Sequence, residues 1–113
     1  MEDCIFCKLA NGEIPTNMIF QDDDMACFSD ASPQAPVHLL LVPKQHIASL
    51  DELKGEHAEL IGKMMLKIKD IAAAEGLENG YRVVINTGED GQQTVKHLHL
   101  HILGKRKMTW PPG

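Results

Sequence analysis

The segment from His97 to Leu103 alternates strictly between histidine and an aliphatic residue. A period of two is typical of a β-strand with one buried face, because successive side chains point to opposite sides of a sheet. We therefore expect Leu98, Leu100 and Ile102 to pack on a core, and the three imidazoles to share the other face. Crowding three ionisable rings raises the cost of charging any one of them. At least one ring should therefore be neutral near pH 7 and able to act as a nucleophile or a metal ligand.

The remaining apolar segments predict an α+β fold. Within residues 49–75, apolar residues recur three and four positions apart, which predicts one long amphipathic helix that Gly76 is suited to end. Residues 2–12 have the spacing of a short helix, ended by Gly12 and Pro15. Apolar or alternating runs bounded by turn residues predict the strands 18–21, 25–30, 38–42, 81–86 and 95–103.

Because short links join neighbouring strands, we expect an antiparallel meander sheet with the long helix packed on one face. A chain of 113 residues is long enough for one core, so we take residues 1–113 as a single domain. Met64, Met65 and Ile68 on the helix are interpreted first as core and second as a partner contact. His57 is interpreted as a solvated side chain without a role.

Charge and cysteine content limit the partners and the compartment. The net charge is −5, so no bulk field attracts nucleic acid or an anionic membrane, and a nucleotide would need a local site. No apolar run approaches the ~18 residues of a membrane span, and the N-terminus has no leader pattern. Three cysteines, an odd number, argue against a closed disulfide framework. We therefore expect a cytoplasmic protein with reduced cysteines.

Three separate segments carry a family resemblance. The chain has Ser-Pro-Gln-Ala-Pro between Asp30 and His38, the alternation from His97 to Leu103, and Trp-Pro-Pro-Gly at residues 110–113. Together they resemble the histidine triad (HIT) family, and more narrowly its Hint branch, over essentially the whole chain. The resemblance implies a purine nucleoside phosphoramidase. Such an enzyme cleaves the P–N bond of adenosine phosphoramidate and aminoacyl-adenylate-like compounds through a covalent nucleotidyl-histidine.

The resemblance also assigns the catalytic residues. His99 matches the nucleophile, whose Nδ1–H is bound by the main-chain carbonyl of the residue matching His97. A neutral imidazole attacks phosphorus well near pH 7, and the bond that it forms is labile enough to be hydrolysed. His101 matches the histidine that contacts the phosphate, and His38 matches its partner in the same network. Thr94 stands where the branch usually has serine, and its hydroxyl could contact the phosphate or the leaving group.

The resemblance implies a nucleotide site around these histidines. Asp30 would take the ribose hydroxyls, and Asn86 would bind phosphate or ribose. Considered alone, either residue could simply be a turn residue, and the aromatic residues of the base pocket could be core. Gly91-Gln92 stands where the branch usually has two glycines. The implied binding residues are Asp30, Ala31, Asn86, Gln92, Gln93, Thr94, His99 and His101, with Ile5, Phe6 and Phe28 around the base.

Cys4 and Cys7 form a C-x-x-C motif near the N-terminus. The surrounding chain offers neither a thioredoxin-like setting nor the second close pair of a zinc finger. Zinc-bearing HIT proteins, by resemblance, complete such a pair with two histidines, which match His46 and His97. Two thiolates and two imidazoles would make a closed structural Zn²⁺ site, with no cofactor needed for the chemistry. The alternative is two buried apolar cysteines, as we expect for Cys27.

Two other functions compete with the phosphoramidase. One is a dinucleotide polyphosphate hydrolase, and the other is a non-catalytic nucleotide- or zinc-binding interaction module. The resemblance further implies a homodimer in which residues 110–113 reach the partner's active site. The expected partners are therefore a purine nucleoside monophosphate or phosphoramidate and a second copy of the chain, with no nucleic acid and no membrane.

Overall fold

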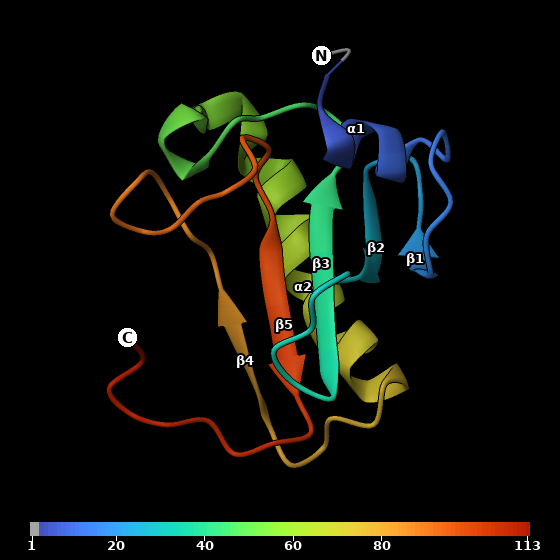
Figure 1. The fold of residues 1–113 in the computed structure, drawn as a ribbon. Coiled ribbons are helices and arrows are strands. Elements are labelled where there is room, and N and C mark those ends of the chain that lie inside the picture. The colour runs from blue at the N-terminus through green and yellow to red at the C-terminus, as the bar shows by residue number, and fades with distance from the viewer. Residues whose placement is uncertain (1–2) are drawn as a thin grey trace.

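The structure, a computed structural model, describes residues 3–113. Five strands form one antiparallel sheet in the order β1-β2-β3-β5-β4 (Figure 1). The strands are β1 (Met18–Gln21), β2 (Met25–Ser29), β3 (Val37–Pro43), β4 (Tyr81–Val84) and β5 (Leu100–Gly104). The helices are α1 (Ile5–Ala10), the 3-10 turns η1 (Leu50–Glu52) and η2 (Gly55–His57), and α2 (Ala58–Ala74). The expected α+β fold, with one long helix and a short N-terminal helix, is confirmed.

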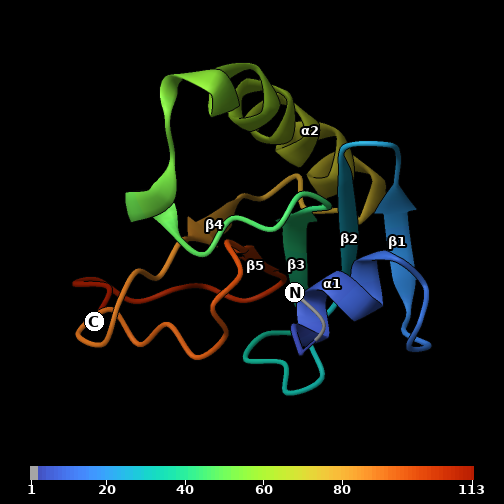
Figure 2. The same cartoon turned by 90° about the horizontal axis from the view of Figure 1, so that it is seen from above.

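The two α-helices cover opposite faces of the sheet (Figure 2). Alternation along β3 divides its side chains between them, because neighbours on a strand point to opposite sides. Leu39 and Leu41 join the larger core with α2, whereas Leu40 and Val42 pack in a second cluster with α1. The larger core also contains the residues that the alternation predicts, together with the apolar face of α2: Leu98, Leu100, Ile102, Met64, Ile68, Ile71 and Ala72.

The order of the last two strands departs from a simple meander. Helix α2 carries the chain from β3 to the far edge of the sheet, where β4 forms, and β5 then returns to lie between β4 and β3. Burial explains this placement, since Leu100, Ile102 and Leu103 of β5 are buried and Tyr81 of β4 is 40% exposed. The central position of β5 brings its side chains next to those of β3.

The final strand is shorter than expected and begins at Leu100 rather than Val95. Its pairing with β3 ends where Leu41 lies opposite Leu100, two residues before Pro43, which has no N–H to extend the ladder. The preceding segment is held differently, because the Leu98 N–H donates to the Ile47 carbonyl at 2.7 Å. The apolar side chains of the alternating segment therefore lie in the core as expected, but His97 and His99 precede the strand and are not part of it.

The helical segments correct three details. Helix α2 begins at Ala58, after the two 3-10 turns, although the pattern placed its start anywhere from residue 49. His57 is buried and not solvated: its Nδ1 accepts from the Lys54 N–H at 2.9 Å, which caps the turn before α2. Met64 and Ile68 are core, whereas Met65 is half exposed. The start of the predicted N-terminal helix at Glu2 lies outside the described residues, and α1 runs from Ile5 to Ala10.

None of the helices within residues 3–113 has both the length and the apolar character needed to cross a bilayer.

Candidate functional site

His99 lies in the segment before β5, with its ring orientation set by the main chain two residues away. Its Nδ1 lies 2.6 Å from the carbonyl oxygen of His97. A carbonyl can only accept, so Nδ1 carries a proton, and in the neutral ring Nε2 then has the lone pair. The edges of Phe6 and His101 face the ring at centroid distances of 4.9 and 5.0 Å. This arrangement presents Nε2 of His99 as a nucleophile or ligand atom, as the family pattern implies.

His38 and His101 form a second pair across β3 and β5. The N–H of Gln34 donates to His38 Nδ1 at 2.9 Å, so the proton of neutral His38 is on Nε2. His38 Nε2 lies 2.9 Å from His101 Nδ1 and 3.4 Å from the Asp30 carboxylate. His38 therefore donates to His101, and the proton of neutral His101 must be on its own Nε2.

The Nε2 atom of His101 is buried and has no hydrogen-bond partner among residues 3–113. A buried donor without a partner costs free energy unless something else binds it. The chain of tautomers from Gln34 through His38 makes this atom an N–H donor, on a ring whose centroid lies 5.0 Å from that of His99. The site thus offers one nucleophilic nitrogen and one hydrogen-bond donor on adjacent rings, which suits a phosphate group.

Burial keeps this second pair neutral. Burial, together with the neighbouring rings of His99 and His38, which repel a second charge, lowers the pKa of His101 to about 4. Burial also lowers the pKa of His38, although the Asp30 carboxylate opposes this shift. Both rings are therefore neutral at pH 7, in agreement with the tautomers that the hydrogen bonds require.

This burial predicts a pH-dependent stability. Unfolded His101 takes up a proton near pH 6.5, whereas folded His101 does so only near pH 4. The unfolded state binds more protons in between, so the contribution of His101 is complete above pH 6.5 and is lost on acidification. Between pH 7 and 4.5 the stability difference between wild type and His101→Asn should change by about 2 kcal/mol, measured by urea unfolding. Equal pH slopes in the two proteins would contradict the neutral, partly buried ring.

Asp30 lies at the end of β2 and uses both carboxylate oxygens. Oδ1 accepts from the Ser32 N–H at 2.7 Å and so caps the turn, as expected of a turn residue. Oδ2 lies 3.4 Å from His38 Nε2. Its neighbour Ala31 is exposed.

The residues expected around the base differ in burial. Phe6 and Phe28 are buried in the cluster under α1 and contact each other edge-on, with ring centroids 5.7 Å apart, whereas Ile5 is 42% exposed.

The loop between β4 and β5 is held mainly by Gln93. Its side chain donates to the carbonyls of Ala48 and Val95, at 2.7 and 3.0 Å, and accepts from the Gly88 N–H at 3.1 Å. The Gln93 N–H is engaged as well, since it donates to the Gly88 carbonyl at 3.0 Å, so both the side chain and the amide of Gln93 hold the loop. Gln92 is exposed and has a φ of +64°, the left-handed conformation in which the branch places a glycine.

Thr94 is exposed and Asn86 is half-buried. Thr94 lines a surface hollow of about 530 Å³ together with Cys4, Ile5 and His46. The structure therefore places Thr94 beside the cysteine pair, on the same side of α1 as Ile5.

The two cysteines of the C-x-x-C motif meet His46 and His97 in one cluster. The sulfur and nitrogen atoms of all four lie within 4.8 Å of one another. His97 Nδ1 lies 3.2 Å from Cys4 Sγ and 3.5 Å from Cys7 Sγ, and His46 Nδ1 lies 3.4 Å from Cys7 Sγ. Zn–S and Zn–N bonds of about 2.3 and 2.0 Å in a tetrahedral site put sulfur and nitrogen about 3.5 Å apart. The four residues therefore fit a zinc ion.

The protonation of the cluster also suits a cation. His97 is fully buried and donates its Nε2–H to the Pro43 carbonyl at 2.8 Å, so Nδ1 keeps a lone pair toward the sulfurs. Without a cation, burial and the adjacent Cys4 raise the pKa of the Cys7 thiol to about 11. A bound metal would reverse that shift and hold both sulfurs as thiolates. Cys27 is fully buried elsewhere in the core, as expected.

Two contributors to this site could not be found by motif reasoning. Gln34 and Pro43 act through main-chain groups, which donate to His38 and accept from His97. Main-chain groups leave no residue-type signal in a sequence.

The chain has many relatives of similar length. The family described as "Scavenger mRNA decapping enzyme C-term binding" matches residues 3–110. An uncharacterised HIT-like protein of Synechococcus elongatus is 54% identical over 112 residues, which cover 99% of this chain and 98% of that protein. The HitA protein of Neisseria gonorrhoeae is 53% identical over 104 residues, covering 92% and 97% of the two chains.

Solved structures show the same fold. A HIT family hydrolase from Legionella pneumophila has a TM-score of 0.95 at 49% identity, covering 98% of this chain and 100% of that chain. A histidine triad protein from Clostridium difficile has a TM-score of 0.93 at 44% identity, covering 96% of both chains. With such relatives over nearly its whole length and with its histidines so arranged, the chain belongs to the histidine triad (HIT) family of hydrolase-like, nucleotide-binding proteins.

Proposed function

We propose that this protein hydrolyses the P–N bond of purine nucleoside 5′-phosphoramidates through a nucleotidyl intermediate on His99. The observation that carries the proposal is the pair of ring nitrogens described above. His99 Nε2 has a free lone pair because Nδ1 donates to the His97 carbonyl, and the adjacent His101 Nε2 is a buried donor without a partner among the described residues. A nucleophile and a donor so paired suit a phosphoryl group better than a purely structural cluster.

In the first step, His99 Nε2 attacks the α-phosphorus, and the P–N bond to the leaving amine breaks. The His101 Nε2–H donates a hydrogen bond to a phosphate oxygen and stabilises the charge that develops there; one such donor contributes about 2.7–4 kcal/mol at comparable sites. In the second step, water attacks the same phosphorus and releases His99. Over both steps, water supplies a hydroxyl to phosphorus and one hydrogen to the departing amine.

The rest of the nucleotide is assigned by analogy with the family. Asp30 would bind the ribose hydroxyls through Oδ2, which lies near His38. Asn86 and the loop with Gln92, Gln93 and Thr94 would surround the phosphate, with Gln93 holding the shape of the loop. Ile5, Phe6, Phe28 and Ala31 would face the base.

We further propose that Cys4, Cys7, His46 and His97 hold one Zn²⁺ ion. The donor set leaves no open position, which is typical of a structural rather than a catalytic zinc. Bound there, the ion would supply cross-linking and not Lewis-acid chemistry at phosphorus. It would fix the ring of His97 and thereby the carbonyl that orients His99. We also propose a cytoplasmic location, a compartment in which the thiols of this cluster and of Cys27 would stay reduced.

A substrate panel tests the enzymatic proposal. We expect purified protein to release AMP from adenosine phosphoramidate with a kcat/KM at least tenfold above that for diadenosine polyphosphates. The match to a family described by a decapping enzyme makes a cap dinucleotide the third substrate of the panel. Preference for either dinucleotide would favour the polyphosphate hydrolase. Binding of AMP without turnover of any of the three would favour the interaction module.

We also propose a homodimer. Among residues 3–113, β4 is an edge strand, and no other strand pairs with the main-chain groups along its outer side. Trp110 is 81% exposed and its ring lies 5.8 Å from the Arg82 guanidinium of that strand, which places a large apolar side chain beside the free edge. Light scattering at micromolar concentration should give twice the mass of one chain, and Trp110→Ala should weaken the association. A monomeric mass for the wild type would contradict this proposal.

A further inference from the structure

We propose that Arg106 is a positioning residue that holds the tautomers of His38 and His101 through the loop between β2 and β3. The inference rests on the proposed function for its catalytic consequence. Its structural content stands on hydrogen bonds that are independent of any substrate.

Arg106 is placed by the turn that follows β5. Gly104 packs so closely on Leu77 that an added Cβ would lie 2.6 Å from Leu77 Cδ2, so a larger residue there would require the Leu77 side chain to move. Lys105 then takes a φ of +69°, in the left-handed region, and reverses the direction of the chain. The reversal brings the Arg106 side chain back toward the loop of residues 30–36, where its Nε–H donates to the Gln34 carbonyl at 2.9 Å.

The main chain of Gln34, through its N–H and its carbonyl, links Arg106 to the pair of His38 and His101. While its carbonyl accepts from Arg106, its N–H donates to His38 Nδ1 at 2.9 Å. His38 Nε2 then donates to His101 Nδ1 at 2.9 Å, which leaves the proton of His101 on the unpartnered Nε2. Loss of the Gln34 contact would let His38 place its proton on either nitrogen. His38 could then stop donating to His101, and His101 Nε2 would lose its proton for part of the time.

The charge of Arg106 strengthens this contact. A hydrogen bond from a guanidinium is roughly twice as strong as one between neutral groups. Polar residues otherwise hold the loop locally: Ser32 donates to Asp30, and the Gln34 side chain donates to the Ser32 carbonyl at 3.0 Å. Arg106 provides a hydrogen bond between this loop and the segment after β5, the strand that carries His101.

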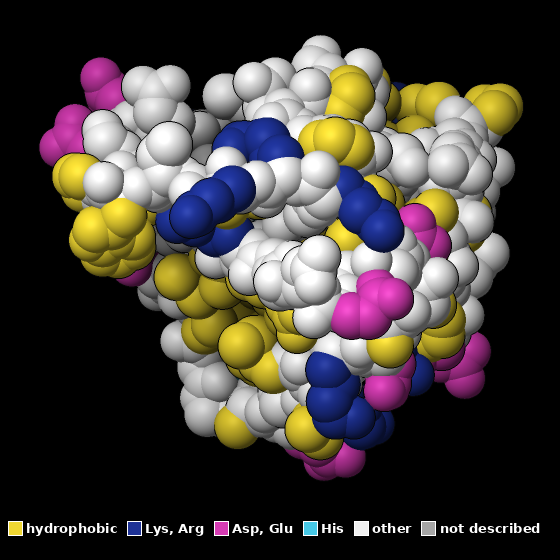
Figure 3. Space-filling view, turned by 90° about the horizontal axis from the view of Figure 1, so that it is seen from below, with side chains coloured by type: hydrophobic (Ala, Val, Ile, Leu, Met, Phe, Trp, Pro, Cys, Tyr) yellow, Lys and Arg dark blue, Asp and Glu magenta, His cyan; other side chains and the backbone are white. Residues whose placement is uncertain are grey.

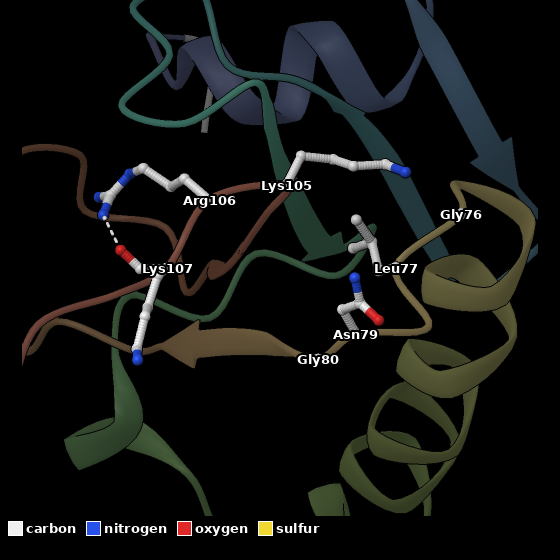
Figure 4. A pocket seen from close by; sticks show the side chains of 7 residues that line it. All are labelled: Gly76, Leu77, Asn79, Gly80, Lys105, Arg106 and Lys107. Atoms are coloured by element: carbon white, nitrogen blue, oxygen red, sulfur yellow. Dashed lines mark hydrogen bonds between the residues drawn. The ribbon is translucent and has the colours of Figure 1, made fainter.

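The neighbouring cations do not share this role. Lys105, Arg106 and Lys107 line a hollow of about 500 Å³ on the lower face, where Lys and Arg side chains gather (Figure 3). In Figure 4 the Lys105 and Lys107 side chains extend away from Arg106 in two other directions, and Lys107 meets the guanidinium through its main-chain carbonyl, which accepts from Nη1 at 3.5 Å. Lys107→Gln therefore removes an adjacent charge but keeps every hydrogen bond of the loop, and it is the matched control for Arg106→Gln.

The experiment combines two-bond ¹⁵N–¹H spectra of the imidazoles with hydrogen exchange of single amides, without substrate. In Arg106→Gln we expect His38 to change from one tautomer to a mixture and the Gln34 amide to exchange about tenfold faster. The Asp30 amide, which donates to the His38 carbonyl at the other end of the loop, should exchange within twofold of wild type. Lys107→Gln should change neither readout, and Arg106→Lys should restore part of the protection.

Turnover gives the catalytic half of the test. With adenosine phosphoramidate, Arg106→Gln should lower kcat about tenfold and leave KM within twofold, because the nucleotide contacts are intact. An unchanged His38 tautomer and Gln34 exchange rate in Arg106→Gln would overturn the inference, whatever the activity. If the wild type does not hydrolyse phosphoramidates, the proposed function fails, while the tautomer and exchange readouts still decide the role of Arg106.

Discussion

Replacing His99 with alanine or asparagine should abolish the nucleotidyl adduct and lower kcat/KM for adenosine phosphoramidate by at least about 10⁴-fold, as expected for loss of a covalent nucleophile. The reason is geometric, because His99 alone among the three triad histidines presents an unprotonated nitrogen at the site. His97 directs its lone pair at the cysteines, and His101 presents an N–H donor. Neither neighbour can replace His99 without changing its tautomer and its contacts.

Intact mass spectrometry after rapid quenching measures the adduct directly. Wild type mixed with adenosine phosphoramidate should gain the mass of one adenylyl group, and both His99 variants should not. His101→Asn is the informative companion, since it keeps the nucleophile: it should still form the adduct, but more slowly. An adduct of full yield in His99→Ala would move the nucleophile to another residue and overturn the assignment. Unchanged zinc content in the variants would show that the loss is local.

The alternation of residues 97–103 predicts part of the core and part of the candidate site. It placed Leu98, Leu100 and Ile102 in the core correctly, because their burial needs only the right face. It did not predict that the strand begins at Leu100. That boundary depends on Pro43, a residue of a different strand that has no N–H to pair. The three imidazoles consequently have different surroundings: His97 lies at the cysteines, whereas His99 and His101 lie near the candidate phosphate site. A continuous strand would have placed all three rings in the same surroundings.

Other features of the fold and the site depend on contacts between residues far apart in the sequence, which local patterns do not predict. In the order β3-β5-β4, the strand that buries more apolar surface, β5, takes the inner position. The sequence pattern of a single strand does not show which of two strands will bury more. His57 is a typical helix-surface residue by its neighbours in sequence, yet the 3-10 turn before α2 turns it inward to accept from Lys54. The cysteine and histidine cluster was predictable in composition from the family resemblance. Its closeness, with all four ligand atoms within 4.8 Å, required the fold.

Metal loss should have the second large effect. Protein purified without a histidine tag should contain about one equivalent of zinc, and Cys7→Ser should contain almost none. An ion present at 1,000 times its Kd stabilises a fold by about 4 kcal/mol. For a chain of this length that corresponds to a fall in Tm of roughly 15 °C. Elemental analysis and thermal unfolding measure the two quantities, and Cys27→Ala is the matched control, because Cys27 is buried outside the cluster.

The same variant connects the metal with the chemistry. His97 binds the cluster through its ring and orients His99 through its carbonyl, so a freed ring should loosen the 2.6 Å contact to His99 Nδ1. Loss of an orienting partner at a metal site typically costs 10- to 100-fold in activity. We therefore expect Cys7→Ser to keep the adduct but form it about tenfold more slowly. Less than about half an equivalent of zinc in the wild type, unaffected by Cys4→Ser, would instead leave Cys4 and Cys7 as two partly buried thiols that merely hydrogen-bond to His97.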